Sequence, residues 1–199
     1  MSRIKICGLF RECDIDYVNE AGPDYIGFIL NFPKSRRNID VPQAARLRSR
    51  LSPGIRAVGV FVDRPEAFVC EAAEDIGLDV LQLHGHEDAE YIEKLKRRTG
   101  LPVWKAFKVR SPEDLEAAGS SPADEVLLDN GYGTGETFDW SVLSGFDRPF
   151  ILAGGLRPGN IAEAVRRLHP KILDISSGVE TDGVKDREKI LAAVREAYE

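Results

Sequence analysis

Short apolar segments rich in β-branched residues recur along the chain, and stretches with helical periodicity separate them. The apolar segments have the length and composition of buried strands, and they begin near Ile4, Tyr25, Arg56, Asp79, Pro102, Glu125, Pro149 and Lys171. The stretches that follow them repeat apolar residues every three or four positions, as amphipathic helices do; they cover residues 14–21, 42–51, 65–76, 88–98, 112–118, 140–143, 159–168 and 186–198. The pattern therefore predicts eight strands, each followed by a helix.

Eight strand–helix units indicate parallel strands joined by right-handed crossovers, and eight is the number that closes into a (β/α)₈ barrel. Prolines near several helix starts support the boundaries, because proline is tolerated where first-turn N–H groups lack partners. A doubly wound open sheet is the alternative, but no Gly-x-Gly-x-x-Gly motif follows the first strand. We expect a compact (β/α)₈ TIM barrel that forms a single domain over residues 1–199, with the helix at 140–143 the weakest.

Composition narrows the possible partners and compartment. The chain of 199 residues is 43% hydrophobic and 30% charged, with a net charge of −6 spread along its length. It has no basic cluster of the kind that binds nucleic acid and no apolar run long enough to cross a membrane. The N-terminal residues do not resemble a secretory signal, and three cysteines give no disulfide framework. We expect a cytoplasmic protein with reduced thiols, and either a monomer or a homodimer.

In (β/α)₈ barrels the chemistry lies where the strands end, and polar residues and glycines collect at those positions here. Cys7 ends the first segment, with Lys5 on the same face of the strand, where its ammonium could favour a thiolate by lowering the pKa of the thiol. Asp129 ends the sixth segment. A buried core cysteine and a turn-forming aspartate are the plain alternatives. Together, the two residues are candidates for cofactor-free proton transfer.

Two glycine-rich loops follow the seventh and eighth segments. The first contains Gly154 and Gly155, and the second contains Ser176, Ser177 and Gly178. Glycines let backbone N–H groups approach an anion closely, and these two loops form the recurrent phosphate site of barrels. The sequence thus predicts a phosphorylated small-molecule substrate, although tight turns would use the same residues.

Further polar residues lie near the same strand ends. Gln82 and His84 share one face of the fourth segment and are candidates for substrate contact, although a structural histidine fits equally well. Arg36 or Arg37, after the second segment, could bind a carboxylate with its planar guanidinium. The histidine spacing does not match a metal motif, so no metal is expected.

Together these residues resemble the phosphoribosylanthranilate isomerase family of tryptophan biosynthesis, over essentially the whole chain. The resemblance is carried by short motifs in the family's order: Lys5-Ile-Cys-Gly8, Gly27-Phe28, Pro33-Lys-Ser-Arg-Arg-Asn-Ile39, Val60-Phe-Val62, Gln82-Leu-His-Gly85, Leu128-Asp-Asn, Gly133-Thr-Gly, Phe138-Asp-Trp140, Ala153-Gly-Gly-Leu156, Ser176-Ser-Gly-Val-Glu180 and Gly183-Val-Lys-Asp186.

The resemblance implies a cofactor-free Amadori rearrangement of N-(5′-phosphoribosyl)anthranilate to 1-(2-carboxyphenylamino)-1-deoxyribulose 5-phosphate. It implies that Asp129 is the general acid that opens the furanose ring and that Cys7 is the general base at C2′. It also implies that Arg37, rather than Arg36, contacts the anthranilate carboxylate, and that the glycine and serine loops bind the phosphate.

Other functions remain as alternatives. The related Amadori isomerase of histidine biosynthesis resembles a carboxylate-base enzyme with a substrate that carries two phosphates, whereas this chain has Cys7 and no second phosphate loop. A Schiff-base aldolase would need an inward lysine near strand six or seven. A pentose-phosphate epimerase would need metal ligands. A non-catalytic phosphate-binding barrel is the alternative from a different class, because fold alone does not establish function.

Overall fold

The structure, a computed structural model, describes residues 2–111, 113–129, 140–143 and 145–199. Eight parallel strands form its centre, and their bounds are β1 Arg3–Cys7, β2 Tyr25–Leu30, β4 Arg56–Phe61, β5 Val80–Leu83, β6 Val103–Lys108, β7 Glu125–Asp129, β8 Phe150–Leu152 and β9 Ile172–Ile175. Each begins within one residue of the position that the apolar pattern predicts. The strand part of the prediction is confirmed.

The sheet closes on itself. Its strands follow the order β1-β9-β8-β7-β6-β5-β4-β2, and a further pairing of β1 with β2 completes the ring. The pairings around the ring are parallel. A short strand β3 (Asn38–Ile39) also pairs in parallel with the last two residues of β2. Because parallel strands point the same way, all their carboxyl ends lie at one end of the barrel. The predicted (β/α)₈ barrel is confirmed, and the open sheet is excluded.

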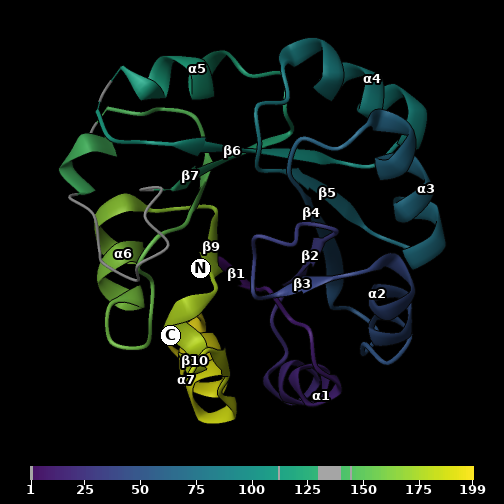
Figure 1. The fold of residues 1–199 in the computed structure, drawn as a ribbon. Helices are drawn as coiled ribbons and strands as arrows, with labels where there is room; N and C mark the ends of the chain where they lie inside the picture. The colour runs from purple at the N-terminus through teal and green to yellow at the C-terminus, as the bar shows by residue number, and fades with distance from the viewer. Residues whose placement is uncertain (1, 112, 130–139, 144) are drawn as a thin grey trace.

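The helices surround the strands, as Figure 1 shows. Their bounds are α1 Glu12–Ala21, α2 Val41–Arg48, α3 Glu66–Ile76, α4 Ala89–Thr99, α5 Asp114–Ser120, α6 Ile161–Leu168 and α7 Arg187–Tyr198. The sixth expected helix is present as a single 3₁₀ turn, η1 Trp140–Leu143. The sequence predicts this helix to be the weakest, and it is short and has the tighter 3₁₀ form, in which i→i+3 bonds replace the i→i+4 bonds of an α-helix. Trp140 and Leu143 still pack into the core.

Two hydrophobic layers hold the barrel together. The larger lies between the strands and the helices, and the smaller fills the barrel with inward side chains from several strands: Tyr25, Val58, Val80, Trp104, Ala106, Leu127, Ile151, Ala153 and Ile172. Two buried charged residues share this inward parity, Lys5 on β1 and Asp174 on β9, and they are opposite each other in the strand register. The described part of the barrel interior is thus mainly apolar, with this charged pair and the polar side chain of Gln82 near its carboxyl end.

A small hairpin follows the last barrel strand. A 3₁₀ turn, η2 Ser177–Val179, leads into two antiparallel strands, β10 Glu180–Thr181 and β11 Val184–Lys185, before α7 begins. The turn residues Asp182 and Gly183 both have positive φ, 52° and 82°. Positive φ at both central residues is the geometry of the tight type I′ turn. The hairpin holds Glu180 and Lys185 close to the carboxyl end of the barrel.

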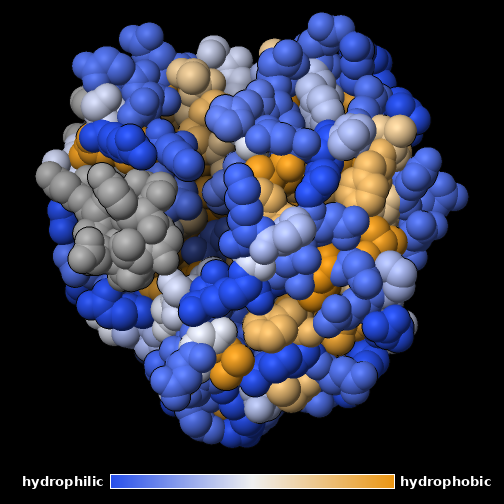
Figure 2. Space-filling model, in the orientation of Figure 1, coloured by the Kyte–Doolittle hydropathy of each residue, from blue (hydrophilic) through white to orange (hydrophobic). Residues whose placement is uncertain are grey.

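Figure 2 shows a mainly hydrophilic face with smaller hydrophobic patches and a hollow near its centre. No helix among the described residues is both long and apolar enough to cross a bilayer.

Candidate active site

A cavity of about 160 Å³ opens at the carboxyl ends of the strands. Its wall combines polar and apolar side chains from seven of the barrel strands and their loops: Cys7, Ile29, Val60, Gln82, His84, Asp129, Ala153, Gly154, Gly155, Leu156, Asp174, Ser176 and Ser177. Of the predicted site residues, only Arg37 and Gly178 are outside this wall. The barrel therefore brings together residues that are more than 100 positions apart in the sequence.

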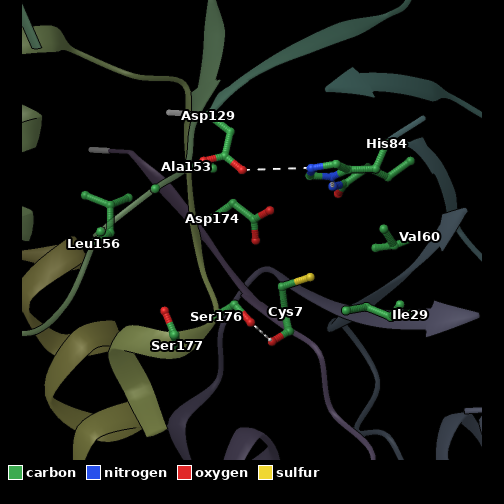
Figure 3. Close-up of a pocket in the computed structure, with 13 residues that line it drawn as sticks. Cys7, Ile29, Val60, His84, Asp129, Ala153, Leu156, Asp174, Ser176 and Ser177 are labelled. Atoms are coloured by element: carbon green, nitrogen blue, oxygen red, sulfur yellow. Dashed lines mark hydrogen bonds and ion pairs between the residues drawn. The ribbon is translucent and has the colours of Figure 1, made fainter. Parts of the chain in front are cut away.

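Cys7 and Asp129 extend into the cavity from opposite sides (Figure 3). Cys7 is the last residue of β1 and is 7% exposed. Gly27 on β2 makes room for it, because a Cβ at that position would lie 2.8 Å from Cys7 Sγ and 3.2 Å from Lys5 Nζ. The Ser176 hydroxyl donates a hydrogen bond of 3.0 Å to the Cys7 carbonyl. The Cys7 backbone is thus linked to the loop after the last barrel strand, while its thiol lies next to Gly27 of β2.

Lys5 lies below the cavity and is fully buried. Its Nζ donates to both carboxylate oxygens of Asp174, at 3.0 and 2.9 Å. Burial acts to lower the pKa of Lys5, but the Asp174 carboxylate and, to a smaller extent, Cys7 together outweigh burial and keep that pKa above its ordinary value. Lys5 is therefore a permanent ammonium whose charge is largely balanced by Asp174.

Lys5 acts to lower the pKa of Cys7, as expected, but the net direction is the opposite of the expected one. Burial raises the pKa of the Cys7 thiol above its ordinary value, and the Lys5 ammonium only partly offsets burial because the Asp174 carboxylate acts against it. A buried thiolate needs a net positive surrounding, and the Lys5–Asp174 pair is nearly neutral as a unit. In the free site, Cys7 is a protonated thiol at neutral pH.

Asp129 ends β7 and faces His84, which follows β5. His84 Nε2 lies 3.8 Å from Asp129 Oδ2, and Gln82 Nε2 lies 3.4 Å from His84 Nδ1. Burial lowers the pKa of His84 below its ordinary value, although the Asp129 carboxylate acts in the opposite direction. His84 is thus a neutral imidazole near neutral pH, placed beside the candidate acid. The glycine-rich segment that follows Asp129, residues 130–139, lies outside the described residues.

The two predicted phosphate loops meet at the cavity. Gly154 and Gly155, after β8, have φ values of 90° and 68°, which L-residues with side chains rarely adopt. Ser176 and Ser177, after β9, face the same space. Gly178 lies behind them, where an added Cβ would come within 1.9 Å of the Leu156 carbonyl oxygen. Gly178 therefore allows the two loops to pack against each other.

Arg37 lies next to the cavity and contacts Glu180 of the hairpin. Its Nε is 2.5 Å from Glu180 Oε1, and its Nη2 is 2.7 Å from Oε2. Its side chain also passes over Gly8, where a Cβ would be 2.4 Å from Arg37 Cδ. The Glu180 contact raises the pKa of Arg37 most, and Cys7 adds a smaller electrostatic contribution. The predicted carboxylate-binding arginine is thus close to Cys7 in space.

The sequence reasoning gave no role to three charged residues of this region, Asp174, Glu180 and Lys185. For Asp174 a signal existed: it is a charged residue at inward parity in an apolar strand, and a closed barrel makes that strand the neighbour of Lys5. Glu180 and Lys185 occur in a recognised motif, but their contact depends on a short hairpin that periodicity does not reveal.

A second cavity of about 900 Å³ adjoins the first and shares His84 and Asp129 with it. The aromatic side chains of Phe32 and Phe107 are part of its wall. Such a wall suits a planar aromatic group, because ring faces pack well on apolar and aromatic surfaces. Among the described residues, no group of three or more His, Cys, Asp or Glu side chains has the arrangement of a metal site.

The closed barrel, the acid–base candidates at its carboxyl end and the glycine loops after its last two strands define a (β/α)₈-barrel enzyme of the phosphate-binding kind. Comparison with known families identifies it more closely. The model of the family described as N-(5′-phosphoribosyl)anthranilate isomerase matches residues 4–196. The chain belongs to this family.

Curated relatives agree with this assignment. The chain is 47% identical over 197 residues to the N-(5′-phosphoribosyl)anthranilate isomerase of Thermoanaerobacter sp. (strain X514), covering 96% of this chain and 95% of that protein. It is 46% identical over 200 residues to the isomerase of Endomicrobium trichonymphae, with 98% of each chain covered.

Solved structures of the family share the fold. The phosphoribosylanthranilate isomerase of Thermotoga maritima is 36% identical and superposes with a TM-score of 0.91, covering 100% of this chain and 99% of that chain. A phosphoribosylanthranilate isomerase in complex with reduced 1-(o-carboxyphenylamino)-1-deoxyribulose 5-phosphate is 35% identical, with a TM-score of 0.89 and the same coverage.

Proposed function

We propose that this chain catalyses the Amadori rearrangement of N-(5′-phosphoribosyl)anthranilate to 1-(2-carboxyphenylamino)-1-deoxyribulose 5-phosphate in tryptophan biosynthesis. The observation that carries the proposal is the pairing of Cys7 and Asp129 across one cavity whose wall also contains the two glycine and serine loops. The family membership supports the same reaction. The reaction moves protons within one substrate, so it requires only an acid, a base and binding groups.

Asp129 is the general acid of the first step. Its carboxylic proton passes to the furanose ring oxygen while the C1′–O bond breaks, and the lone pair of the anthranilate nitrogen forms a protonated Schiff base at C1′. Asp129 becomes a carboxylate in this step. His84 lies 3.8 Å away and can stabilise the developing charge through a hydrogen bond from Nε2, if Gln82 donates to Nδ1 and so fixes that tautomer.

Cys7 is the general base of the second step. The protonated Schiff base is a cation next to C2′, so ring opening adds positive charge close to the thiol, beside Lys5. That charge favours loss of the thiol proton to solvent water, and the thiolate formed in this way removes the C2′ proton and leaves an enolamine. The enolamine then loses the proton on its C2′ oxygen and gains one at C1′, which gives the ketone. The raised pKa of free Cys7 thus requires the base to form within the substrate complex.

The remaining residues bind the two ends of the substrate. Backbone N–H groups of Gly154, Gly155 and Gly178, with Ser176 and Ser177, take the phosphate. Arg37 takes the anthranilate carboxylate, and the cavity beside Phe32 and Phe107 accepts the aromatic ring. Gln82 lines the first cavity, and His84 lines both.

The proposal includes the wider setting. We place the enzyme in the cytoplasm, without cofactor or metal, with a small phosphorylated molecule as its partner and with residues 1–199 as one catalytic domain. It is either a monomer or a homodimer; the Thermotoga maritima relative is described as dimeric, and monomers of it have also been crystallised.

The test is the loss of anthranilate fluorescence when the purified chain meets freshly generated N-(5′-phosphoribosyl)anthranilate in the presence of a chelator. Rapid loss supports the proposal. Turnover of the histidine-pathway Amadori substrate at comparable efficiency would reassign the reaction, and binding of sugar phosphates with no turnover would leave a phosphate-binding barrel.

A further inference from the structure

The carboxylate of Glu180 is where three cationic side chains meet. Arg37 contacts it through Nε at 2.5 Å and Nη2 at 2.7 Å, Arg36 through Nη2 at 2.6 Å, and Lys185 through Nζ at 2.7 Å. Both carboxylate oxygens are used, and the Arg37 contact has the bidentate geometry that fixes a guanidinium in its plane. The cluster therefore determines where the plane of Arg37 lies.

The three cationic side chains that contact Glu180 differ in how deeply they are buried. The Glu180 side chain is 3% exposed and that of Lys185 is 0% exposed, whereas Arg37 is 17% exposed and Arg36 is 59% exposed. Burial acts to raise the pKa of Glu180, but the hydrogen bond from Arg37 and the charge of Lys185 together lower it to about 2. Glu180 is therefore a carboxylate at all ordinary pH values, and Arg36 is the outermost of its partners.

A glycine next to each of the two arginines leaves room for its side chain. Gly8 has a φ of 80°, and a Cβ there would lie 2.4 Å from Arg37 Cδ. Gly183 has a φ of 82°, and a Cβ there would lie 2.9 Å from Arg36 Nη1. A side chain at either position would displace one of the two arginines. The end of β1 and the hairpin turn thus form the two walls of a slot for Arg36 and Arg37.

The cluster is also connected to the strand that carries Cys7. Lys185 Nζ donates to the Ser176 carbonyl at 2.9 Å, and the Ser176 hydroxyl donates to the Cys7 carbonyl at 3.0 Å. A shift of the hairpin would therefore change the position of Arg37 and the end of β1 together. The Glu180 contact uses the Nε–Nη2 edge of Arg37 and not Nη1.

We propose that Glu180 is a positioning residue for substrate recognition: it holds Arg37 by the Nε–Nη2 edge so that the Nη1 group is presented to the carboxylate of the substrate. This inference rests on the proposed function, in which Arg37 binds that carboxylate. The hairpin from Glu180 to Lys185 then serves as a specificity element for aromatic amines that carry an ortho carboxylate. The competing explanation is that the contacts of Glu180 only stabilise the fold.

The experiment compares two ligands that differ only in the carboxylate. One is the reduced product analogue, 1-(o-carboxyphenylamino)-1-deoxyribulose 5-phosphate reduced at its ketone, and the other is the same molecule without the carboxyl group. Their dissociation constants are measured by calorimetry for the wild type and for Glu180→Gln. We expect Glu180→Gln to weaken the carboxylate ligand about 10- to 100-fold, because a misplaced guanidinium loses its aligned contact, and to weaken the other ligand less than about threefold.

Two further variants sharpen the comparison. Glu180→Asp keeps the charge but shortens the reach, so an intermediate loss confined to the carboxylate ligand is expected, and it replaces Glu180→Gln if that variant does not fold. Arg36→Gln removes a cation from the same carboxylate at its exposed edge, and should change both affinities less than about threefold.

The outcomes are distinct. If the Glu180 variants bind both ligands more weakly to the same extent, or bind both as tightly as the wild type, the contacts of Glu180 only stabilise the fold. That result would overturn the inference while the proposed function stands. The same selective loss in Arg36→Gln would assign the carboxylate to Arg36 and overturn it as well. A wild type that binds both ligands equally would remove the role of Arg37 in the proposed function, and this inference with it.

Discussion

Replacing Asp174 by Asn should destabilise the protein strongly, because it leaves the Lys5 ammonium buried without a counter-charge. The Lys5 side chain is 0% exposed and that of Asp174 is 8% exposed, and Lys5 Nζ lies 2.9 Å from Asp174 Oδ2. Removing one partner of a buried ion pair typically costs about 3–5 kcal/mol. In a domain of this size about 1 kcal/mol shifts the melting temperature by roughly 2–4 °C, so a decrease of roughly 6–20 °C is expected.

The double variant Lys5→Met/Asp174→Leu separates the charge from the packing. Replacing a buried pair by apolar side chains of similar volume is often neutral, so the double variant should recover most of the lost free energy of unfolding. The free energy of unfolding of the wild type, of Asp174→Asn and of the double variant is measured by guanidinium denaturation at pH 7 with linear extrapolation. Glu163→Gln, which breaks the exposed pair between Arg167 and Glu163, is the control and should change stability by less than about 0.5 kcal/mol.

Two results would refute this reasoning. A cost below about 1 kcal/mol for Asp174→Asn would mean that Lys5 reaches water or loses its proton without penalty. A double variant as unstable as the single one would mean that packing around these side chains, and not the unpaired charge, determines the loss.

Three other predictions follow from the same site. Alkylation of Cys7 in the free protein should accelerate only above the ordinary thiol range, because burial raises its pKa; rapid alkylation near pH 7, followed by mass spectrometry, would contradict this. Gly178→Ala should raise KM for the phosphorylated substrate, because a Cβ would lie 1.9 Å from the Leu156 carbonyl oxygen, whereas Gly119→Ala, where the nearest atom is 3.9 Å away, should leave KM unchanged. The Glu180 carboxylate has its pKa lowered from 4.5 to about 2, so it contributes stability above pH 4.5 that is lost as pH falls towards 2; Glu180→Gln should therefore flatten the acid limb of the stability curve, and an unchanged limb would disprove the assignment.

The fold was predictable from the sequence because each of its units is local. Strand starts and most helices follow from apolar periodicity and proline positions, and the number of units implies closure. The segment at 140–143, expected to be the weakest helix, is a 3₁₀ helix and not an α-helix.

The location of the site residues was predictable from the sequence, but their charge pairing and pKa values were not. Cys7 and Asp129 are at strand ends, so the barrel rule brings them to one cavity. The pKa of Cys7 depends instead on how Lys5 is shared with Asp174, a residue 169 positions away in the sequence. Likewise, the contact between Arg37 and Glu180 depends on a hairpin of two-residue strands, which leaves no periodic signal. Such non-local pairings determine charge and orientation, and only the folded chain reveals them.

The most direct test of the central claim measures the two proton transfers separately in Cys7→Ala and Asp129→Asn. Single-turnover loss of anthranilate fluorescence is followed with N-(5′-phosphoribosyl)anthranilate carrying either hydrogen or deuterium at C2′. We expect both variants to lose activity by at least about 100-fold, since each lacks one acid–base group, while both still bind the reduced product analogue. Retention of more than about a tenth of the wild-type rate by Cys7→Ala, with an unchanged deuterium effect, would show that another group removes the C2′ proton and would contradict the account.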